Sequence, residues 1–241
     1  MNERFDLIVI GGGILGISTA YHAARMGGVS VLVLERNQIA SQATPRAAAL
    51  LTQIRYKTSQ LHIVKRTFAA IEELRAELKD DFGLRRTGSL HVASSPTTEA
   101  PLKLHAEEAR RTGVEIAWID ADEARRHTPW LNASSATAIA WTPSDMIADP
   151  HLFTHAYAAA ARAGGAVVRT NTAVTGLVRD GNSVLGVKTD AGEIHAGAVI
   201  DAGGAWASLI AREAGANLPM APVWSHYWVT APDAGFPPNM A

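Results

Sequence analysis

The chain has 241 residues, 47% of them hydrophobic, and this length suffices to bury the core of one large domain or two small ones. A net charge of −1 with scattered basic residues argues against nucleic acid as a partner. The absence of cysteine excludes thiolate metal sites, disulfides and a cysteinyl link to a cofactor, and it favours a reducing cytoplasm.

The first elements form a nucleotide-binding pattern. An apolar strand at 6–10 runs into a GxGxxG motif and then into an alanine-rich helix, whose N-terminal N–H groups can face phosphates. A second apolar strand at 29–34 ends at Glu35, where a carboxylate can accept hydrogen bonds from ribose hydroxyls and would repel a 2′-phosphate. Strand, glycines, helix, strand and acid together predict a dinucleotide site.

The middle of the chain predicts a separate set of elements. Apolar residues at helical spacing indicate a long helix that ends near Leu78. The elements expected after it are a strand at 86–93, a helix at 97–112, a short helix at 120–127 and a strand at 136–142. Asp145 and Asp149 are expected to cap the helix that begins at Pro150.

The sheet pattern resumes after residue 150. The expected elements are a helix at 150–163, strands at 166–169, 173–179, 184–189, 193–196 and 198–201, and a helix at 205–214. We therefore predict one discontinuous nucleotide-binding domain, at 1–85 and 146–215, with an inserted domain at 86–145 that restarts at 216–241. Strand character at 223–230 is followed by a Pro- and Gly-rich end, so the inserted domain is expected to be incomplete.

Five segments carry a resemblance to a known family: FDLIVIGGGILGISTAYHAA, VLVLERN, SQATPRAAALL, VVRTNTAVTGLV and AVIDAGGAWASLIAREAG. The chain resembles the D-amino acid oxidase superfamily of FAD-dependent oxidoreductases, especially sarcosine oxidase beta subunits and dimethylglycine dehydrogenases. The resemblance implies an α/β fold with a Rossmann-like FAD-binding domain, made of a parallel sheet and a three-stranded meander, and an inserted, incomplete α+β substrate domain. It also implies noncovalent FAD, because no His or Cys occupies the stretch where some relatives attach the cofactor.

The resemblance assigns cofactor contacts residue by residue. Pyrophosphate contacts fall on Gly11, Gly13, Ile14, Leu15 and Gly16; adenosine contacts on Glu35 and Arg36; and the diphosphate and flavin approach on Ser41, Thr44, Arg46 and Ala47. The backbone of Val174 is expected to bond adenine, and the ribityl side is expected to be closed by Ala202, Gly203 and Trp206. Two departures concern glycines that are usual in the family: Pro45 stands in place of one, and the other is expected near Ala49.

The implied reaction is oxidation of the C–N bond of an amino acid or N-methyl amine by hydride transfer to flavin. Arg55 matches an arginine that binds the substrate carboxylate, although a solvated arginine at a helix start explains it equally well. Tyr227 and His226 lie on the expected strand that contributes pocket side chains, and their side chains would point to opposite faces. Two alternatives remain open: an NAD-dependent dehydrogenase, and a noncatalytic nucleotide-binding fragment. The expected partners are a small amine or amino acid and, if the protein is one subunit of an oxidase complex, further chains.

Overall fold

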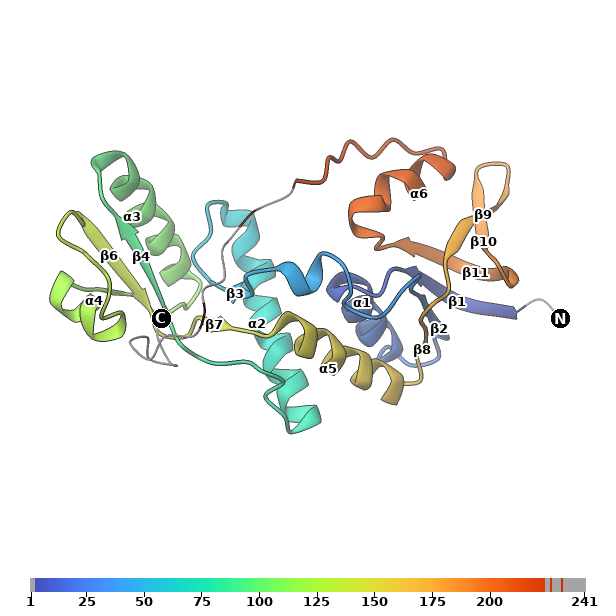
Figure 1. Ribbon diagram of the computed structural model, residues 1–241, viewed down its shortest axis with the longest axis horizontal. Helices are drawn as coiled ribbons and strands as arrows, with labels where there is room; N and C mark the ends of the chain where they lie inside the picture. The colour runs from blue at the N-terminus through green and yellow to red at the C-terminus, as the bar shows by residue number, and fades with distance from the viewer. Residues whose placement is uncertain (1–2, 224–225, 227–230, 232–241) are drawn as a thin grey trace. The chain divides into compact units, whose positions relative to one another are not determined.

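The computed structural model describes residues 3–223, 226 and 231, and the chain divides into two compact units. The first unit comprises Met1–Ala48 with Asp149–Tyr227, and the second comprises Ala49–Ala148 with Trp228–Ala241. Figure 1 shows the elements of each unit in the colours of the chain order. The first unit is therefore discontinuous in sequence, with the second inserted into it.

A six-stranded sheet forms the centre of the first unit. Its order is β8 (Val167–Arg169), β2 (Val31–Leu34), β1 (Glu3–Ile10), β11 (Gly192–Asp201), β10 (Ser183–Thr189) and β9 (Val174–Asp180). Strands β8, β2, β1 and β11 run parallel. Strand β11 also begins an antiparallel meander with β10 and β9. All four residues of β2 are buried, as expected of a parallel strand covered on both faces. The predicted Rossmann-like architecture is confirmed.

Helices cover this sheet (Figure 1). They are α1 (Ile14–Ala24), α5 (Pro150–Ala163) and α6 (Ala207–Glu213), with the 3₁₀ turns η1 (Thr44–Arg46) and η2 (Gly204–Trp206). The α1 and α5 helices pack together through alanines and an edge-to-face pair of Tyr21 and Tyr157, with ring centroids 5.2 Å apart. One oxygen of Asp149 accepts the first free N–H groups of α5, so the predicted Asp149 cap is confirmed.

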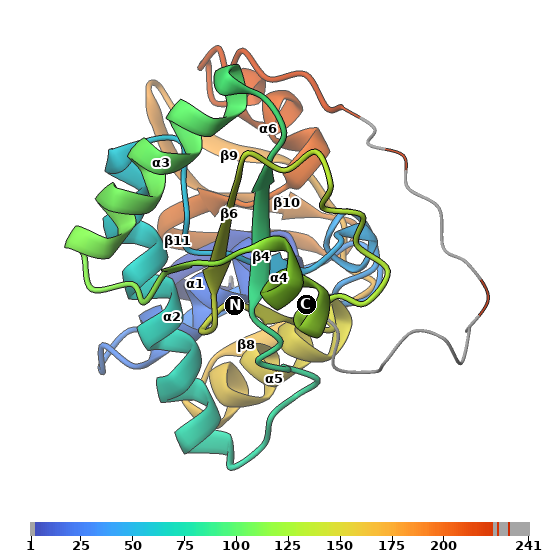
Figure 2. The same ribbon diagram turned by 90° about the vertical axis from the view of Figure 1, so that its left-hand side faces the viewer.

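The second unit is built on a small antiparallel sheet. Its strands are β4 (Ser89–Ala93), β6 (Ala138–Thr142) and β5 (Ala117–Trp118), in that order, and Figure 2 shows β4 and β6 side by side. Helices α3 (Pro96–Arg111) and α4 (Ala121–His127) pack on this sheet, and α2 (Thr58–Leu78) packs on α3. A separate two-stranded ladder joins β3 (Leu50–Leu51) to β7 (Met146–Ile147).

Asp145 corrects one prediction, because it does not cap α5. Its side chain is fully buried, and its carboxylate accepts hydrogen bonds from the backbone N–H of Gln53 at 3.0 Å and from the hydroxyl of Ser89 at 2.6 Å. The amide of Gln53 adds a third bond at 3.1 Å. A buried carboxylate is tolerated when donors surround it, so Asp145 joins the segment before α2 to β4.

Two further differences have physical causes. The expected strands at 193–196 and 198–201 form the single strand β11, because β11 pairs with β1 in one register on both sides of Gly197. A side chain at Gly197 would come within 3.0 Å of the Asp6 carbonyl on β1. That glycine thus marks a close approach of two strands and not a turn. Residues 49–85 lie in the second unit by contacts, since α2 packs on α3, whereas the sequence places them with the nucleotide-binding part.

The predicted strand at 223–230 and the end at 231–241 fall almost wholly outside the described residues. Within the part of the chain that the structure describes, every helix is too short or too polar to cross a bilayer.

Candidate functional site

The glycine turn between β1 and α1 lies against the turn that follows β11. Gly11 has a φ of +115°, and a side chain there would overlap the carbonyl oxygen of Ala202. Gly16 faces the same turn, and a Cβ on it would overlap the carbonyl oxygen of Gly11. Only glycine fits at both positions, so the two nucleotide signatures of the sequence form one continuous backbone surface.

Glu35 lies at the end of β2 with its carboxylate turned toward this surface. One oxygen accepts the Gly12 N–H at 2.7 Å and the other accepts the Asn37 N–H at 2.7 Å. The residue is 9% exposed, so the carboxylate is fixed in place before any ligand arrives. Gly12 is a site residue that the sequence analysis did not single out; a Cβ on it would approach the Glu35 side chain to 2.8 Å.

The segment after β2 closes over the start of α1. The Thr44 hydroxyl accepts the Ile14 N–H at 3.1 Å, while the N–H groups of Gly13 and Leu15 have no acceptor among the described residues. The Ser41 hydroxyl oxygen is buried and has no partner in that part of the chain either. A helix N-terminus with free N–H groups and an unpaired hydroxyl is suited to an anion such as a phosphate.

Arg46 contacts the backbone of the segment that follows β2. Its guanidinium donates to the carbonyl oxygens of Ser41 and Gln42, at 3.3 Å for Ser41, and thereby braces the same segment. Ala47 follows as the residue that ends η1, and its N–H bonds the Thr44 carbonyl at 3.1 Å.

The turn after β11 supplies the other wall. The Ala202 N–H bonds the Ile10 carbonyl at 2.9 Å, and the Gly203 N–H bonds the Asp201 carboxylate at 2.9 Å. Burial raises the pKa of Asp201, and the hydrogen bond from Gly203 opposes part of that rise. The second oxygen of Asp201 is buried and has no partner among the described residues.

These segments enclose a cavity of about 540 Å³ that lies wholly within the first unit. Of the predicted cofactor residues, the cavity is lined by Gly11, Gly13, Ile14, Leu15, Glu35, Arg36, Ser41, Thr44, Val174, Ala202, Gly203 and Trp206. Gly16, Arg46 and Ala47 do not line it. The wall also contains residues that were not among the predicted cofactor contacts, namely Ile10, Leu34, Gln42, Ala43, Ala173, Gly204, Ala205, Leu209, Ile210 and Glu213. The apolar residues Leu209 and Ile210 of α6 could have been found from the apolar pattern of that helix.

Arg36, which follows β2, and Trp206, which ends η2, contact each other at this cavity. The Arg36 guanidinium carbon lies 3.8 Å from the centroid of the Trp206 ring, which is a close cation–π contact. Both side chains are substantially exposed, and Trp206 retains 38% of its surface. The pair therefore offers a flat surface beside the cavity.

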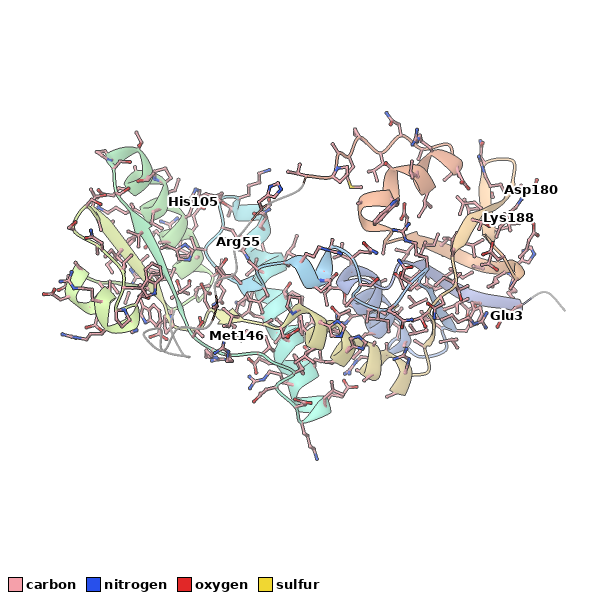
Figure 3. All side chains as sticks on the ribbon, viewed as in Figure 1. Glu3, Arg55, His105, Met146, Asp180 and Lys188 are labelled. Atoms are coloured by element: carbon pink, nitrogen blue, oxygen red, sulfur yellow. The ribbon has the colours of Figure 1, made fainter. Side chains whose placement is uncertain are left out.

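Of the two predicted substrate residues, Arg55 and Tyr227, the structure describes only Arg55. Arg55, labelled in Figure 3, belongs to the second unit, on the loop between β3 and α2. Its guanidinium donates to the Thr52 hydroxyl and to the Ile54 carbonyl, the latter at 3.2 Å. Tyr227 lies outside the described residues, and His226 is described as an exposed residue.

A parallel sheet with a glycine turn, a helix N-terminus and an acid at the end of the second strand defines a dinucleotide-binding protein. Comparison with protein families narrows this class. The family model described as FAD dependent oxidoreductase matches residues 6–240, and the chain belongs to this family.

Relatives agree with this assignment. The chain is 29% identical over 229 residues to human mitochondrial dimethylglycine dehydrogenase, covering 95% of this chain and 26% of that protein. It is 29% identical to sarcosine oxidase subunit beta of Arthrobacter sp, covering 90% of this chain and 55% of the relative. The solved structure of L-proline dehydrogenase from P. horikoshii superposes with a TM-score of 0.83 at 32% identity, over 89% of this chain and 57% of that one. The chain thus spans between about a quarter and about three fifths of these proteins.

Proposed function

We propose that the protein is the FAD-binding part of an oxidoreductase that oxidises the C–N bond of an amino acid or N-methyl amine. The cavity between the two nucleotide signatures carries this proposal. Support for the substrate class comes from the relatives, whose names specify dimethylglycine, sarcosine and proline. When bound, FAD supplies the acceptor for the hydride that leaves the carbon next to nitrogen.

The residues present fit such a cofactor. Gly11 and Gly13 line the cavity with their backbone, and the free N–H groups at the start of α1 match the charge of a pyrophosphate. The unpaired Ser41 hydroxyl adds a further donor. Gly11, Gly13, Ile14, Leu15, Ser41 and Thr44 would hold the pyrophosphate, and Glu35 with Arg36 the adenosine. Val174 would contact adenine through its backbone, and Ala202, Gly203 and Trp206 the ribityl chain.

The roles of the remaining predicted residues follow from where they lie. Gly16 would act by packing α1 against the glycine turn, and Arg46 by bracing the segment that carries Ser41. Ala47 would approach the flavin ring, a role that the family resemblance alone supports. Arg55 and Tyr227 would bind the carboxylate and the body of the substrate; for both, the support is the family resemblance alone.

Partners and location complete the proposal. Sarcosine oxidase subunit beta is by name one subunit of an oxidase, so we extend to this chain the possibility of assembly with further chains. The substrate would be a small amine or amino acid, and FAD would be held noncovalently. A cytoplasmic location rests on the lack of cysteine, which fits a reducing compartment. Fractionation of the native host would test that location.

An NAD-dependent dehydrogenase is the second candidate, because GxGxxG with a distal acid also binds NAD. The turn at Ala202–Gly204 that closes the cavity favours FAD, since it belongs to the second signature of the flavin family. Anaerobic mixing of the FAD-loaded protein with sarcosine, dimethylglycine, proline and D-amino acids tests the proposal. Loss of the oxidised flavin absorbance with one of these substrates supports it. Reduction of added NAD without any bound flavin would overturn it.

A further inference from the structure

Asp201 lies at the junction of the two nucleotide signatures, and its carboxyl group is not used by any proposed FAD contact. It ends β11, directly opposite Ile10 at the end of β1. Its Oδ1 atom accepts the N–H of Gly203, a residue of the cavity wall. A side chain on Gly203 would come within 2.9 Å of that oxygen, so the carboxyl group and the turn fit closely together.

The turn held by Asp201 is the one that supports Gly11. Ala202 lies between Asp201 and Gly203, and its carbonyl oxygen occupies the space that a Gly11 side chain would need. The Ala202 N–H bonds the Ile10 carbonyl at 2.9 Å, which fixes the turn to the end of β1. A movement of Gly203 would therefore displace the wall against which the first glycine turn rests.

The other oxygen of Asp201 makes the ionised form unfavourable. Oδ2 is buried and has no partner among the described residues, so it has lost water without gaining a donor. Burial raises the pKa of this carboxyl group, with the Gly203 hydrogen bond as the opposing effect. A proton on Oδ2 removes the buried charge and leaves Oδ1 free to accept the Gly203 N–H.

The charged groups on the neighbouring elements do not neutralise Asp201. Glu35 and Arg36 follow β2, where Glu35 accepts the N–H of Gly12 and Arg36 stacks on Trp206. On α6, Glu213 accepts the Leu177 N–H at 3.1 Å, and Arg212 is exposed. None of these groups contributes to the shift in the pKa of Asp201.

We propose that Asp201 is a positioning residue of the FAD site, which fixes the Ala202–Gly204 turn through Gly203 and becomes protonated when FAD binds. This inference rests on the proposed function. An anionic pyrophosphate brought into the adjoining cavity disfavours a second negative charge, so FAD binding takes up a proton at Asp201. FAD affinity consequently falls as the pH rises.

The test is a titration of the protein with FAD, followed by quenching of flavin fluorescence, at several pH values from about 4 to about 8. The esterified phosphates of FAD keep a constant charge over this range. Wild type is expected to lose about tenfold in affinity across it, the equivalent of one unit in pKa. Asp201→Asn keeps the acceptor without a charge, so its affinity should match that of wild type at the acidic end and stay constant.

Asp201→Ala leaves the Gly203 N–H without its acceptor, and we expect it to bind FAD about tenfold more weakly at every pH. Thermal denaturation of each variant establishes that it is folded, and Asp190→Asn, an exposed change on the same meander, should retain the wild-type pH profile. Unchanged affinity in Asp201→Ala, an equal loss in Asp201→Asn, or a flat wild-type profile would overturn the inference alone. Failure of wild type to bind FAD at any pH would instead overturn the proposed function, and this inference with it.

Discussion

Glu35 shows how one side chain prepares a binding surface. Both of its oxygens already accept backbone N–H groups, from Gly12 and Asn37, at 2.7 Å each. A carboxylate has further lone pairs, so it can hold the backbone and still receive ribose hydroxyls. The strand and the acid could be predicted from the sequence. The hydrogen bond from Gly12 to Glu35 could not be predicted, because the GxGxxG motif does not specify the residue at position 12.

We expect Glu35→Gln to weaken FAD binding by about tenfold, because one amide hydrogen must face a backbone N–H and one buried bond is lost. Equilibrium dialysis with FAD measures this directly. Glu115→Gln, an exposed change in the second unit, provides the matched control and should bind as wild type does. Equal affinity of Glu35→Gln and wild type would remove Glu35 from the site.

Ala49 has an unusual backbone conformation, which bears on the glycine that the family resemblance leads one to expect near it. The residue has a φ of +60°, a left-handed conformation that glycine adopts without cost and that alanine disfavours by about 1 kcal/mol. A glycine at this position would match the backbone, and the alanine of this chain carries strain there.

Ala49→Gly should raise the free energy of unfolding by about 0.5 kcal/mol, since relief of strain outweighs the added freedom of the unfolded chain. Chemical denaturation monitored by circular dichroism provides the measurement. Ala48→Gly, next to it and without a positive φ, should lower the same quantity by about 0.5 kcal/mol. Destabilisation of similar size by both variants would contradict the account of Ala49.

At the scale of elements, the long periodic segments could be predicted from the sequence, whereas the two-residue strands could not. Helix α5 begins and ends at the residues expected, because Asp149, Pro150 and Gly164 mark its ends chemically. Strands β3, β5 and β7 have two residues each, too few to show alternation, and they exist through their partners. Asp145, beside β7, was misjudged for the same reason: its partners Gln53 and Ser89 are distant in sequence.

Asp145→Ala should destabilise the second unit by about 3 kcal/mol, because it leaves buried donors at Gln53 and Ser89 unpaired. Asp149→Ala removes only an exposed helix cap and should cost about 1 kcal/mol. Urea denaturation of the two variants gives the comparison. A smaller loss in Asp145→Ala than in Asp149→Ala would show that the buried cluster does not hold the segment.

The hydrogen bonds between Asp6 on β1 and Ser30, just before β2, should make stability depend on pH in acid. The Asp6 carboxylate accepts from the Ser30 N–H at 2.8 Å and from the Ser30 hydroxyl at 2.7 Å, and these bonds lower the pKa of Asp6. A lowered pKa in the folded state adds stability above the unfolded value, near pH 4, that is lost as the pH falls through the folded value. Thermal denaturation of Ser30→Ala should differ from wild type at neutral pH and converge with it in acid; a constant difference would refute this linkage.

For the whole molecule, the discontinuous order of the units has a functional consequence. The first unit takes residues from both sides of the insertion, and its cavity takes a wall from each. Both nucleotide signatures must therefore fold together before a site exists. The repeated return of the chain to one parallel sheet was predictable from the strand pattern, whereas the precise lining contributed by α6 required the packed structure.

The central claim is that the cavity between these signatures holds FAD. Titration of the purified chain with FAD and with NADH, each followed by its own fluorescence, tests this most directly. Saturable binding of one FAD per chain, abolished in Gly11→Ala because the new side chain overlaps the Ala202 carbonyl, is the predicted result. Binding of NADH with no uptake of FAD, or FAD binding that Gly11→Ala leaves intact, would contradict the account.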